Sequence, residues 1–403
     1  MRELIEKNQK LNKLINEFID NGFEIYFVGG VVRDYLLNRE IHDIDFTTSA
    51  SPDEMIEMLG EDYKLNLNGL KHGTVGVIIN GKMYEITTFR TEGGYLDKRH
   101  PDYVRFVKNI YEDLARRDYT INALAVSLQN DNEIIDYFDG QKDLENHLIR
   151  TVLNPDRRFN EDALRILRAL RFASTLSFDI ENKTKESIFK NYHLLDDISS
   201  ERIVDEIKRM IVQEKFNDIF KEFHEVFEYI LGLDLNIEKV DLIYNAINKL
   251  DSDYERLSLL FYFSKEDSNN LDRLRFSNFE KGIIINSVKI ANELVNNDKE
   301  MRTVFRKYPT RFVLCGVKVK GAIDGKTEDY LRLYEANKGK PNHICDLKIN
   351  GFDLIKNKIR KKKIGILLSR LLDEVIDEKL NNDYDSLMKR STEIEEEIHL
   401  QND

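Results

Sequence analysis

The chain has 403 residues, a formal net charge of −12 and two cysteines. The length allows two to four domains, and the acidic balance excludes a surface that is basic throughout, so that any nucleic-acid contact must come from local basic patches. The two cysteines do not have the spacing of a metal or redox site. The first residues lack the apolar core of a secretory signal, and no stretch is apolar for long enough to span a bilayer. We therefore expect a cytoplasmic protein that contacts no membrane.

The pattern of the chain changes near residue 150. The residues before it mix strand and helix signals, whereas those after it are almost entirely helical in pattern. We expect a helix over about 2–20, a strand over 24–28 and, after a Gly29-Gly30 turn, a helix over 31–37. The sequence therefore predicts an α/β head followed by an all-α remainder.

An acidic pair, Asp43 and Asp45, follows thirteen residues after Gly30. Residues i and i+2 of a strand project from the same face, so the two carboxylates point together and repel unless a cation lies between them. Mg²⁺ prefers such oxygen ligands, and two Mg²⁺ ions can activate a hydroxyl and neutralise a triphosphate leaving group. A bare Asp-x-Asp is more often a solvated turn, but backbone amides at Gly29-Gly30 and the charge of Arg33 can hold phosphate. The pattern predicts a metal-dependent phosphoryl-transfer site.

A hairpin is expected next, with strands over 75–79 and 83–89 around Asn80-Gly81, a dipeptide typical of type I′ turns. Glu85 on the second strand is either a third carboxylate near the metals or a charged residue on a half-solvated strand, and both interpretations stay open. The charged, glycine-rich segment 90–103 is long enough to favour a functional loop beside the site over an ordinary connection. Its candidate residues are Arg90, Asp97 and Arg99.

A pair of arginines precedes the next apolar run. Asp118 or Thr120 is expected to cap a helix, leaving Arg116 and Arg117 just before its N-terminus. From there Arg117 can reach a triphosphate or a ribose, although surface salt bridges would explain an isolated Arg-Arg-Asp equally well.

A helix is predicted to begin near Asn160. Glu161 and Arg165 would form an i,i+4 ion pair, while Asp162 and Arg165 would share a face. An aspartate accepts from the exocyclic amine of cytosine or adenine and an arginine donates to the neighbouring ring nitrogen, so this pair would select C and A over U and G by roughly 1–3 kcal/mol per contact. Arg168 and Arg171 continue the spacing and are expected to contact phosphate, ribose or the helix's own acids.

Five motifs keep the order and spacing of the class II tRNA nucleotidyltransferases, the family of bacterial CCA-adding enzymes and poly(A) polymerases, which this chain therefore resembles over residues 23–210. Residues 201–206 resemble the family's neck motif and residues 347–357 the start of its tail. The motifs are Gly29-Gly30-x-x-Arg33-Asp34, Asp43-x-Asp45, the segment from Glu85 to Arg90, Arg116-Arg117-Asp118-x-Thr-x-Asn122-Ala and Glu161-Asp162-x-x-Arg165.

The resemblance implies a polymerase β-like nucleotidyltransferase head with a mixed sheet over 1–150, then a helical neck over 151–215, a body over 216–340 and a tail over 341–403. It implies that Asp43 and Asp45 hold Mg²⁺ in a two-metal mechanism, with Glu85 as a possible third catalytic carboxylate. It also assigns nucleotide binding to Gly29, Gly30, Arg33, Arg117, Asp162, Arg165, Arg168 and Arg171, and bracing of the neck to Glu161, Glu201, Arg202 and Glu206.

The implied activity is template-independent addition of CCA to the 3′ end of tRNA from CTP and ATP, with release of pyrophosphate and no obligatory protein partner. An A-adding enzyme stays open. A CC-adding enzyme is disfavoured because the loop is retained, a poly(A) polymerase because no long basic tail is present, and a non-catalytic RNA-binding module because Asp43, Asp45 and Arg117 are intact. The candidate tRNA-phosphate contacts are residues 356–363 and a looser set of Arg306, Lys307, Arg311, Lys318 and Lys320.

Overall fold

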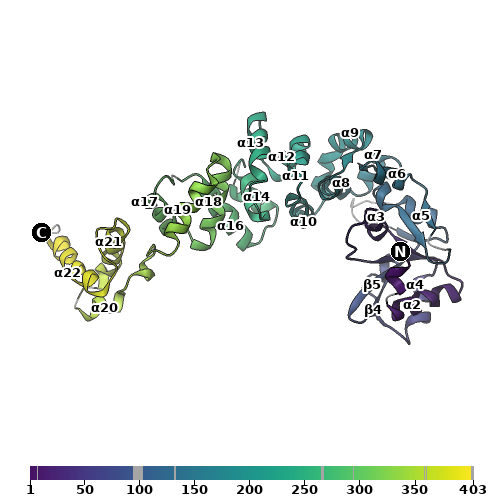
Figure 1. The fold of residues 1–403 in the computed structure, drawn as a ribbon, viewed down its shortest axis with the longest axis horizontal. Helices are drawn as coiled ribbons and strands as arrows, with labels where there is room; N and C mark the ends of the chain where they lie inside the picture. The colour runs from purple at the N-terminus through teal and green to yellow at the C-terminus, as the bar shows by residue number, and fades with distance from the viewer. Residues whose placement is uncertain are drawn as a thin grey trace. The chain divides into compact units, whose positions relative to one another are not determined.

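The computed structural model describes residues 1–6, 8–93, 103–130, 133–264, 267–293, 295–357, 359 and 361–400. The chain forms two compact units, residues 1–219 and 220–403. Figure 1 shows strands gathered in the first part of the chain and helices from α7 onward, which confirms the predicted α/β head with a helical remainder. The finer division at residues 150, 215 and 340 stays a prediction.

The first unit is built on a seven-stranded mixed sheet of order β3-β4-β5-β2-β1-β8-β9. β1 lies inside the sheet between β2 and β8 and is fully buried, and its Phe27 stacks on Phe46 of β2 with ring centroids 5.2 Å apart. β2 is antiparallel to β1 and parallel to β5. The strands are β1 (Ile25–Val28), β2 (Asp45–Thr48), β3 (Lys64–Asn66), β4 (Thr74–Ile79), β5 (Lys82–Thr88), β8 (Leu124–Ser127) and β9 (Ile134–Asp136).

Helices and two small sheets complete this unit. The expected first helix is interrupted at Asn8, whose side chain caps α2 by accepting from the N–H of Leu11. The helices are α1 (Glu3–Glu6), α2 (Gln9–Asp20), α3 (Gly30–Leu36), α4 (Pro52–Leu59), α5 (Ile110–Ala115), α6 (Gly140–Glu145), α7 (Pro155–Glu161), α8 (Leu164–Leu176), α9 (Asn182–Asn191) and α10 (Ser200–Ile211). The small sheets pair β6 (Arg90–Gly93) with β7 (Tyr103–Phe106) and β10 (Leu148–Ile149) with β11 (Asp179–Ile180).

The predicted hairpin is confirmed, since Asn80 and Gly81 both have positive φ and connect β4 to β5. The helix predicted after Asp118 is wrong. Residues 120–122 form one 3₁₀ turn, and the apolar run that follows is β8, in which Val126 pairs with Phe27 of β1. A short apolar run does not distinguish a buried strand from a helix, and the pairing with β1 decides the outcome here.

The second unit is helical throughout its described residues. Its helices after α11 (Phe216–Glu222), which lies at the boundary, are α12 (His224–Leu231), α13 (Ile237–Ile247), α14 (Asp253–Phe261), α15 (Asp267–Arg273), α16 (Asn278–Ala291), α17 (Asp298–Lys307), α18 (Thr310–Asp324), α19 (Thr327–Asn337), α20 (Gly351–Lys356), α21 (Ile364–Ile376) and α22 (Tyr384–Leu400). Close packing of α16 on α18 depends on Gly316, where a Cβ atom would lie 2.5 Å from Cβ of Ile290. No described helix is long and apolar enough to cross a membrane.

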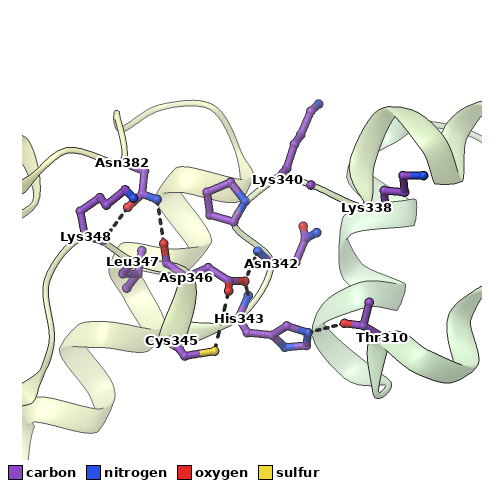
Figure 2. Close-up of a pocket in the computed structure, with 12 residues that line it drawn as sticks. Thr310, Lys338, Lys340, Asn342, His343, Cys345, Asp346, Leu347, Lys348 and Asn382 are labelled. Carbon is purple, nitrogen blue, oxygen red and sulfur yellow. Dashed lines mark hydrogen bonds between the residues drawn. The ribbon is translucent and has the colours of Figure 1, made fainter.

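The segment between α19 and α20 is fixed by hydrogen bonds. Figure 2 shows the pocket there, with a volume of about 580 Å³. Asp346 accepts from the backbone N–H groups of Asn342 and His343 through Oδ2, at 3.0 and 2.8 Å. The buried Arg302 of α17 donates to the backbone carbonyls of residues 341, 375 and 376, which include the last carbonyls of α21. The bonds from Arg302 join α17 to the C-terminal helices. The bonds to Asp346 occupy the one carboxylate that lines the pocket.

Candidate active site

The predicted carboxylates gather at the start of β2. Asp45 opens this strand, and Asp43 lies two residues earlier, outside the strand, so the prediction that both aspartates lie on one strand is wrong for Asp43. Glu85 of β5 is the register partner of Asp45, so the two side chains leave the sheet on the same face. Desolvation by surrounding protein atoms and the charge of Glu85 raise the pKa of Asp45, Arg117 opposes this rise, and Asp43 adds to it. The site therefore concentrates negative charge that a cation would relieve.

These carboxylates fit Mg²⁺ by the chemistry of their donor atoms. In the part of the chain that the structure describes, no three His, Cys, Asp or Glu side chains form a group that could hold a metal ion. Mg²⁺ is usually held by one or two carboxylates, with water and substrate phosphates completing its coordination. Asp43 and Asp45 match that arrangement, whereas Glu85 does not complete a three-carboxylate group. The catalytic role of Glu85 stays a prediction.

The glycine pair forms the turn between β1 and α3. Gly29 has φ +76°, a conformation that L side chains rarely adopt, and a Cβ atom there would lie 3.1 Å from Nη1 of Arg117. Glycine thus permits both the turn and the close approach of Arg117. Gly30 begins α3, where a Cβ atom would lie 3.6 Å from Nη2 of Arg33.

Hydrogen bonds join two of the predicted motifs to each other and to Arg168. Arg33 pairs with Asp34 through two bonds of 2.9 Å and donates from Nη1 to Oδ1 of Asn122 at 2.8 Å. Asn122 donates to Asp118 at 3.2 Å, and Asp118 receives two further bonds from Arg168, at 2.8 and 2.6 Å. Burial favours protonation of Asp118, but the charge of Arg168 outweighs it and holds the pKa of this carboxyl well below its usual range.

Phe172 of α8 lies among three predicted nucleotide-binding arginines. The guanidinium carbons of Arg33, Arg168 and Arg171 lie 5.3, 5.3 and 4.2 Å from its ring centroid. Arg171 also pairs with Glu206 of α10 at 2.5 Å. The aromatic ring and the acids thus hold these cations close together despite their mutual repulsion.

Arg117 belongs to a second ion-pair network. The fully buried carboxylate of Asp113 accepts from Arg116 at 2.9 Å and from Arg117 at 3.1 Å, and these arginines overcome the effect of burial and lower its pKa. Glu92 of β6 bridges Arg116 and Arg90, at 3.2 and 2.8 Å. The network connects Arg117 to β6. The prediction that Arg90 belongs to a loop is wrong, because Arg90 lies on β6 and pairs with Phe106 of β7. Asp97 and Arg99 lie outside the described residues.

The prediction of one helix through Glu161, Asp162 and Arg165 is wrong. α7 ends at Glu161, Asp162 has extended dihedral angles, and α8 begins at Leu164. Asp162 lies one residue before Ala163, the N-cap of the new helix, and accepts from the N–H of Leu164 at 3.0 Å, because an aspartate side chain can satisfy the free amides of a first turn. The predicted ion pair of Glu161 with Arg165 is confirmed at 2.8 Å.

A pocket of about 270 Å³ lies at this helix break. It contains four of the predicted nucleotide-binding residues together with Arg202, which pairs with Asp162 at 3.0 Å and has a buried Nη1 without a partner in the described structure. Sequence reasoning placed Arg202 among the bracing residues of the neck and missed its position in the pocket wall. Glu201 lies in the first turn of α10, beside it in sequence. The lining residues are Arg116, Arg117, Asp118, Asp162, Leu164, Arg165, Arg168 and Arg202.

The fold and the carboxylate pair place the first unit in the class of polymerase-type nucleotidyltransferases. Residues 25–150 match the family model of the poly A polymerase head domain, and residues 177–230 match the model of a probable RNA and SrmB-binding site of polymerase A. These matches cover the strands that carry Asp45 and Glu85 and the helix that carries Arg202.

Comparison with individual proteins narrows the class. The CCA-adding enzyme of Pediococcus pentosaceus is 35% identical over 95% of this chain and 97% of its own length, and that of Ligilactobacillus salivarius is 36% identical over 96% and 97%. The chain therefore belongs to the family of CCA-adding enzymes. The enzyme of Lactobacillus helveticus is 50% identical, but this alignment spans 53% of the chain and 55% of that relative.

Solved structures agree with this assignment. The CCA-adding enzyme of Bacillus stearothermophilus in complex with CTP aligns with a TM-score of 0.77 and 29% identity, covering 96% of this chain and 98% of that one. The Thermotoga maritima CCA-adding enzyme in complex with tRNA aligns with a TM-score of 0.69 at 23% identity, which shows that the fold is shared.

Proposed function

We propose that this chain adds CCA to the 3′ end of tRNA from CTP and ATP, without a nucleic-acid template and with Mg²⁺. The observation that carries the proposal is the pocket at the helix break, in which Asp162 and Arg165 lie beside Arg117 and Arg168. Relatives named CCA-adding enzymes that align over nearly the whole chain support the same activity.

The residues have separable roles in this proposal. Asp43 and Asp45 would hold Mg²⁺, which when bound supplies positive charge to the reacting phosphates. The arginines of the pocket would orient the triphosphate through charge-assisted hydrogen bonds. The 3′ hydroxyl of the tRNA would then form a bond to the α-phosphorus of the nucleotide as the bond to pyrophosphate breaks.

Base selection would come from Asp162 and Arg165. The oxygens of Asp162 accept from the N–H of Leu164 and from Arg202. Each carboxylate oxygen has a second lone pair, so Asp162 can still accept from the amine of cytosine or adenine. Uracil and guanine present a carbonyl at that position, and this oxygen would be repelled by the carboxylate because both groups only accept hydrogen bonds.

Nucleotide incorporation into three tRNA transcripts tests this proposal. The transcripts end before the CCA, after C and after CC, and each is offered CTP, ATP or both with Mg²⁺. We expect all three to be extended to CCA and no further, and we expect EDTA to stop the reaction. A single A added only to the CC-ended transcript would indicate an A-adding enzyme, long A tails a poly(A) polymerase, and no transfer at all a non-catalytic module.

A further inference from the structure

The two basic sets expected to contact tRNA differ in how their charges are compensated. In the looser set, Lys318 lies 2.8 Å from Asp251 and 3.1 Å from Glu255, and Lys320 lies 3.3 Å from Asp324. Arg306 pairs with Asp373 and Lys307 with Glu293. Most of these cations are neutralised by neighbouring acids, so this set is a poor candidate for phosphate binding.

The compact set is not compensated in this way. Among the described residues, no carboxylate lies within 4.0 Å of the ammonium groups of Lys356, Lys361 and Lys363. The one acid of α20, Asp353, accepts from the backbone N–H of Asn350 at 2.8 Å and so caps the helix. Positive charge therefore stays available at this end of an otherwise acidic chain.

An exposed aromatic side chain lies within this basic region. Phe352 is 84% exposed, the largest value among the large hydrophobic side chains of the described residues. It shares the outer face of α20 with Ile355 and Lys356, whereas Leu354 on the opposite face is fully buried in the core of the C-terminal helices. Isolated exposed hydrophobic residues are common, but this one shares its helix face with Lys356, a lysine without a carboxylate within 4.0 Å among the described residues.

Phe352 is also held on a fixed support. Asn350 caps α20 by accepting from the N–H groups of Phe352 and Asp353, at 2.8 and 3.4 Å. α20 packs on α21: a Cβ atom at Gly351 of α20 would lie 3.4 Å from Cγ2 of Ile364, the first residue of α21. The ring therefore projects from a capped and packed turn, which reduces the entropy lost when a ligand binds.

We propose that Phe352 is a stacking platform for an unpaired base of the tRNA, and that Lys356, Lys361 and Lys363 contact the adjacent phosphates. This inference rests on the proposed function. Bases in an A-form stem are hidden within the helix, whereas bases in loops are free to stack on aromatic side chains. A face that combines a bare aromatic ring with lysines matches the chemistry of a looped nucleic acid.

A second copy of the chain is a poorer occupant. A twofold contact places the same patch on both subunits, so the lysines of one copy would lie against those of the other. The net charge of −12 on each copy adds further repulsion.

The test compares two substrates in four proteins. The substrates are a full-length tRNA and a hairpin of the acceptor stem closed by a tight tetraloop. The proteins are the wild type, Phe352→Leu, Phe352→Tyr and the control Phe279→Leu. The control removes an aromatic ring on α16 that is 54% exposed. We expect Phe352→Leu to raise KM for full-length tRNA about tenfold, with kcat and KM for CTP unchanged. Phe352→Tyr should behave as the wild type, Phe279→Leu should leave KM for tRNA unchanged, and the hairpin should show no dependence on residue 352.

The lysines give an independent readout. Replacing Lys356, Lys361 and Lys363 by glutamine should reduce the slope of log KM for tRNA against log salt concentration by roughly 2, since each lost phosphate contact removes about 0.7 to 0.9.

Equal KM values for Phe352→Leu and wild type, or an equal rise with the hairpin, would overturn the inference. So would a wild-type dimer, seen by sedimentation, that Phe352→Leu dissociates. If the wild type extends neither substrate, the proposed function itself fails; if it extends both and residue 352 has no effect, only this inference fails.

Discussion

The arginines of the pocket at the helix break and the lysines around α20 carry the same sign of charge but are held in opposite ways. In the pocket, buried or half-buried acids fix the guanidinium groups, as Asp113 does for Arg117 and Asp118 for Arg168. Around α20, the described lysines have no acidic partner within 4.0 Å.

This difference suits two kinds of ligand. A pocket of about 270 Å³ that is proposed to bind the edge of one base requires groups already in position, and ion pairs with buried acids hold its arginines in place. A surface that attracts a polyanion benefits from uncompensated and mobile charge, whose effect depends on salt. The first region would therefore determine selectivity, and the second would mainly determine affinity for tRNA.

The largest effect expected is on the carboxylate pair. Asp45→Asn or Asp43→Asn removes a carboxylate that is proposed to hold Mg²⁺, and we expect nucleotide transfer to fall by about 10³-fold or more, equivalent to roughly 4 kcal/mol. Binding of tRNA, measured by filter retention, should remain as in the wild type because the α20 region is unchanged. Asp53→Asn, at an exposed position in the first turn of α4, is the matched control. Equal loss of transfer and of tRNA binding would contradict a division of labour between the two regions.

Base selectivity should respond next. Asp162→Asn keeps an oxygen that can cap α8 but adds an amide donor toward the base. We expect the ratio of kcat/KM for CTP to that for UTP to fall by roughly 10- to 100-fold, as one contact of about 1–3 kcal/mol is lost. Single-turnover incorporation of each nucleotide measures this ratio. An unchanged ratio would remove Asp162 from base recognition and leave it as a helix cap.

Stability should depend on Asp118. At neutral pH, Asp118→Asn leaves Arg168 without its partner, and we expect the free energy of unfolding to fall by about 2 kcal/mol. This is below the 3–5 kcal/mol of fully buried pairs because the Arg168 side chain is 34% exposed. The pKa of Asp118 is lower in the folded chain, so its stabilisation is present above about pH 4 and is lost as the pH falls further. Urea unfolding at pH 7 and pH 3 should therefore show that the free energies of unfolding of the wild type and Asp118→Asn differ less at pH 3 than at pH 7.

The smallest effect should come from Glu85. Because Glu85 raises the pKa of Asp45, Glu85→Gln should lower it, and Asp45 should then stay ionised to a lower pH. At fixed Mg²⁺ we expect the acidic limb of the kcat/KM profile to move to lower pH, with the plateau unchanged. A loss of 100-fold or more on the plateau would instead make Glu85 a catalytic carboxylate.

Much of the site could be read from local sequence. The Gly29-Gly30 turn and the Asn80-Gly81 hairpin depend on residues close together in the chain, and each was predicted at its observed position, whereas of the acidic pair only Asp45 lies on the predicted strand. The nearness of Glu85 to Asp45 was only one of two interpretations, because it depends on the parallel register of β2 and β5. The break of the helix at Asp162 was missed, since an acid in a first turn and an acid that caps a new helix look alike in sequence.

The sequence by itself determined the family, the order of the chemical motifs and the candidates proposed to hold Mg²⁺ and a nucleotide, because those properties depend on residue type and short spacing. Only the tertiary structure decided which charges are available. Arg33 meets Asn122 and Arg168 meets Asp118, across 89 and 50 residues, and Lys318 is neutralised by Asp251 across 67. Such pairs form when packing brings distant segments within hydrogen-bond distance, which no local pattern records.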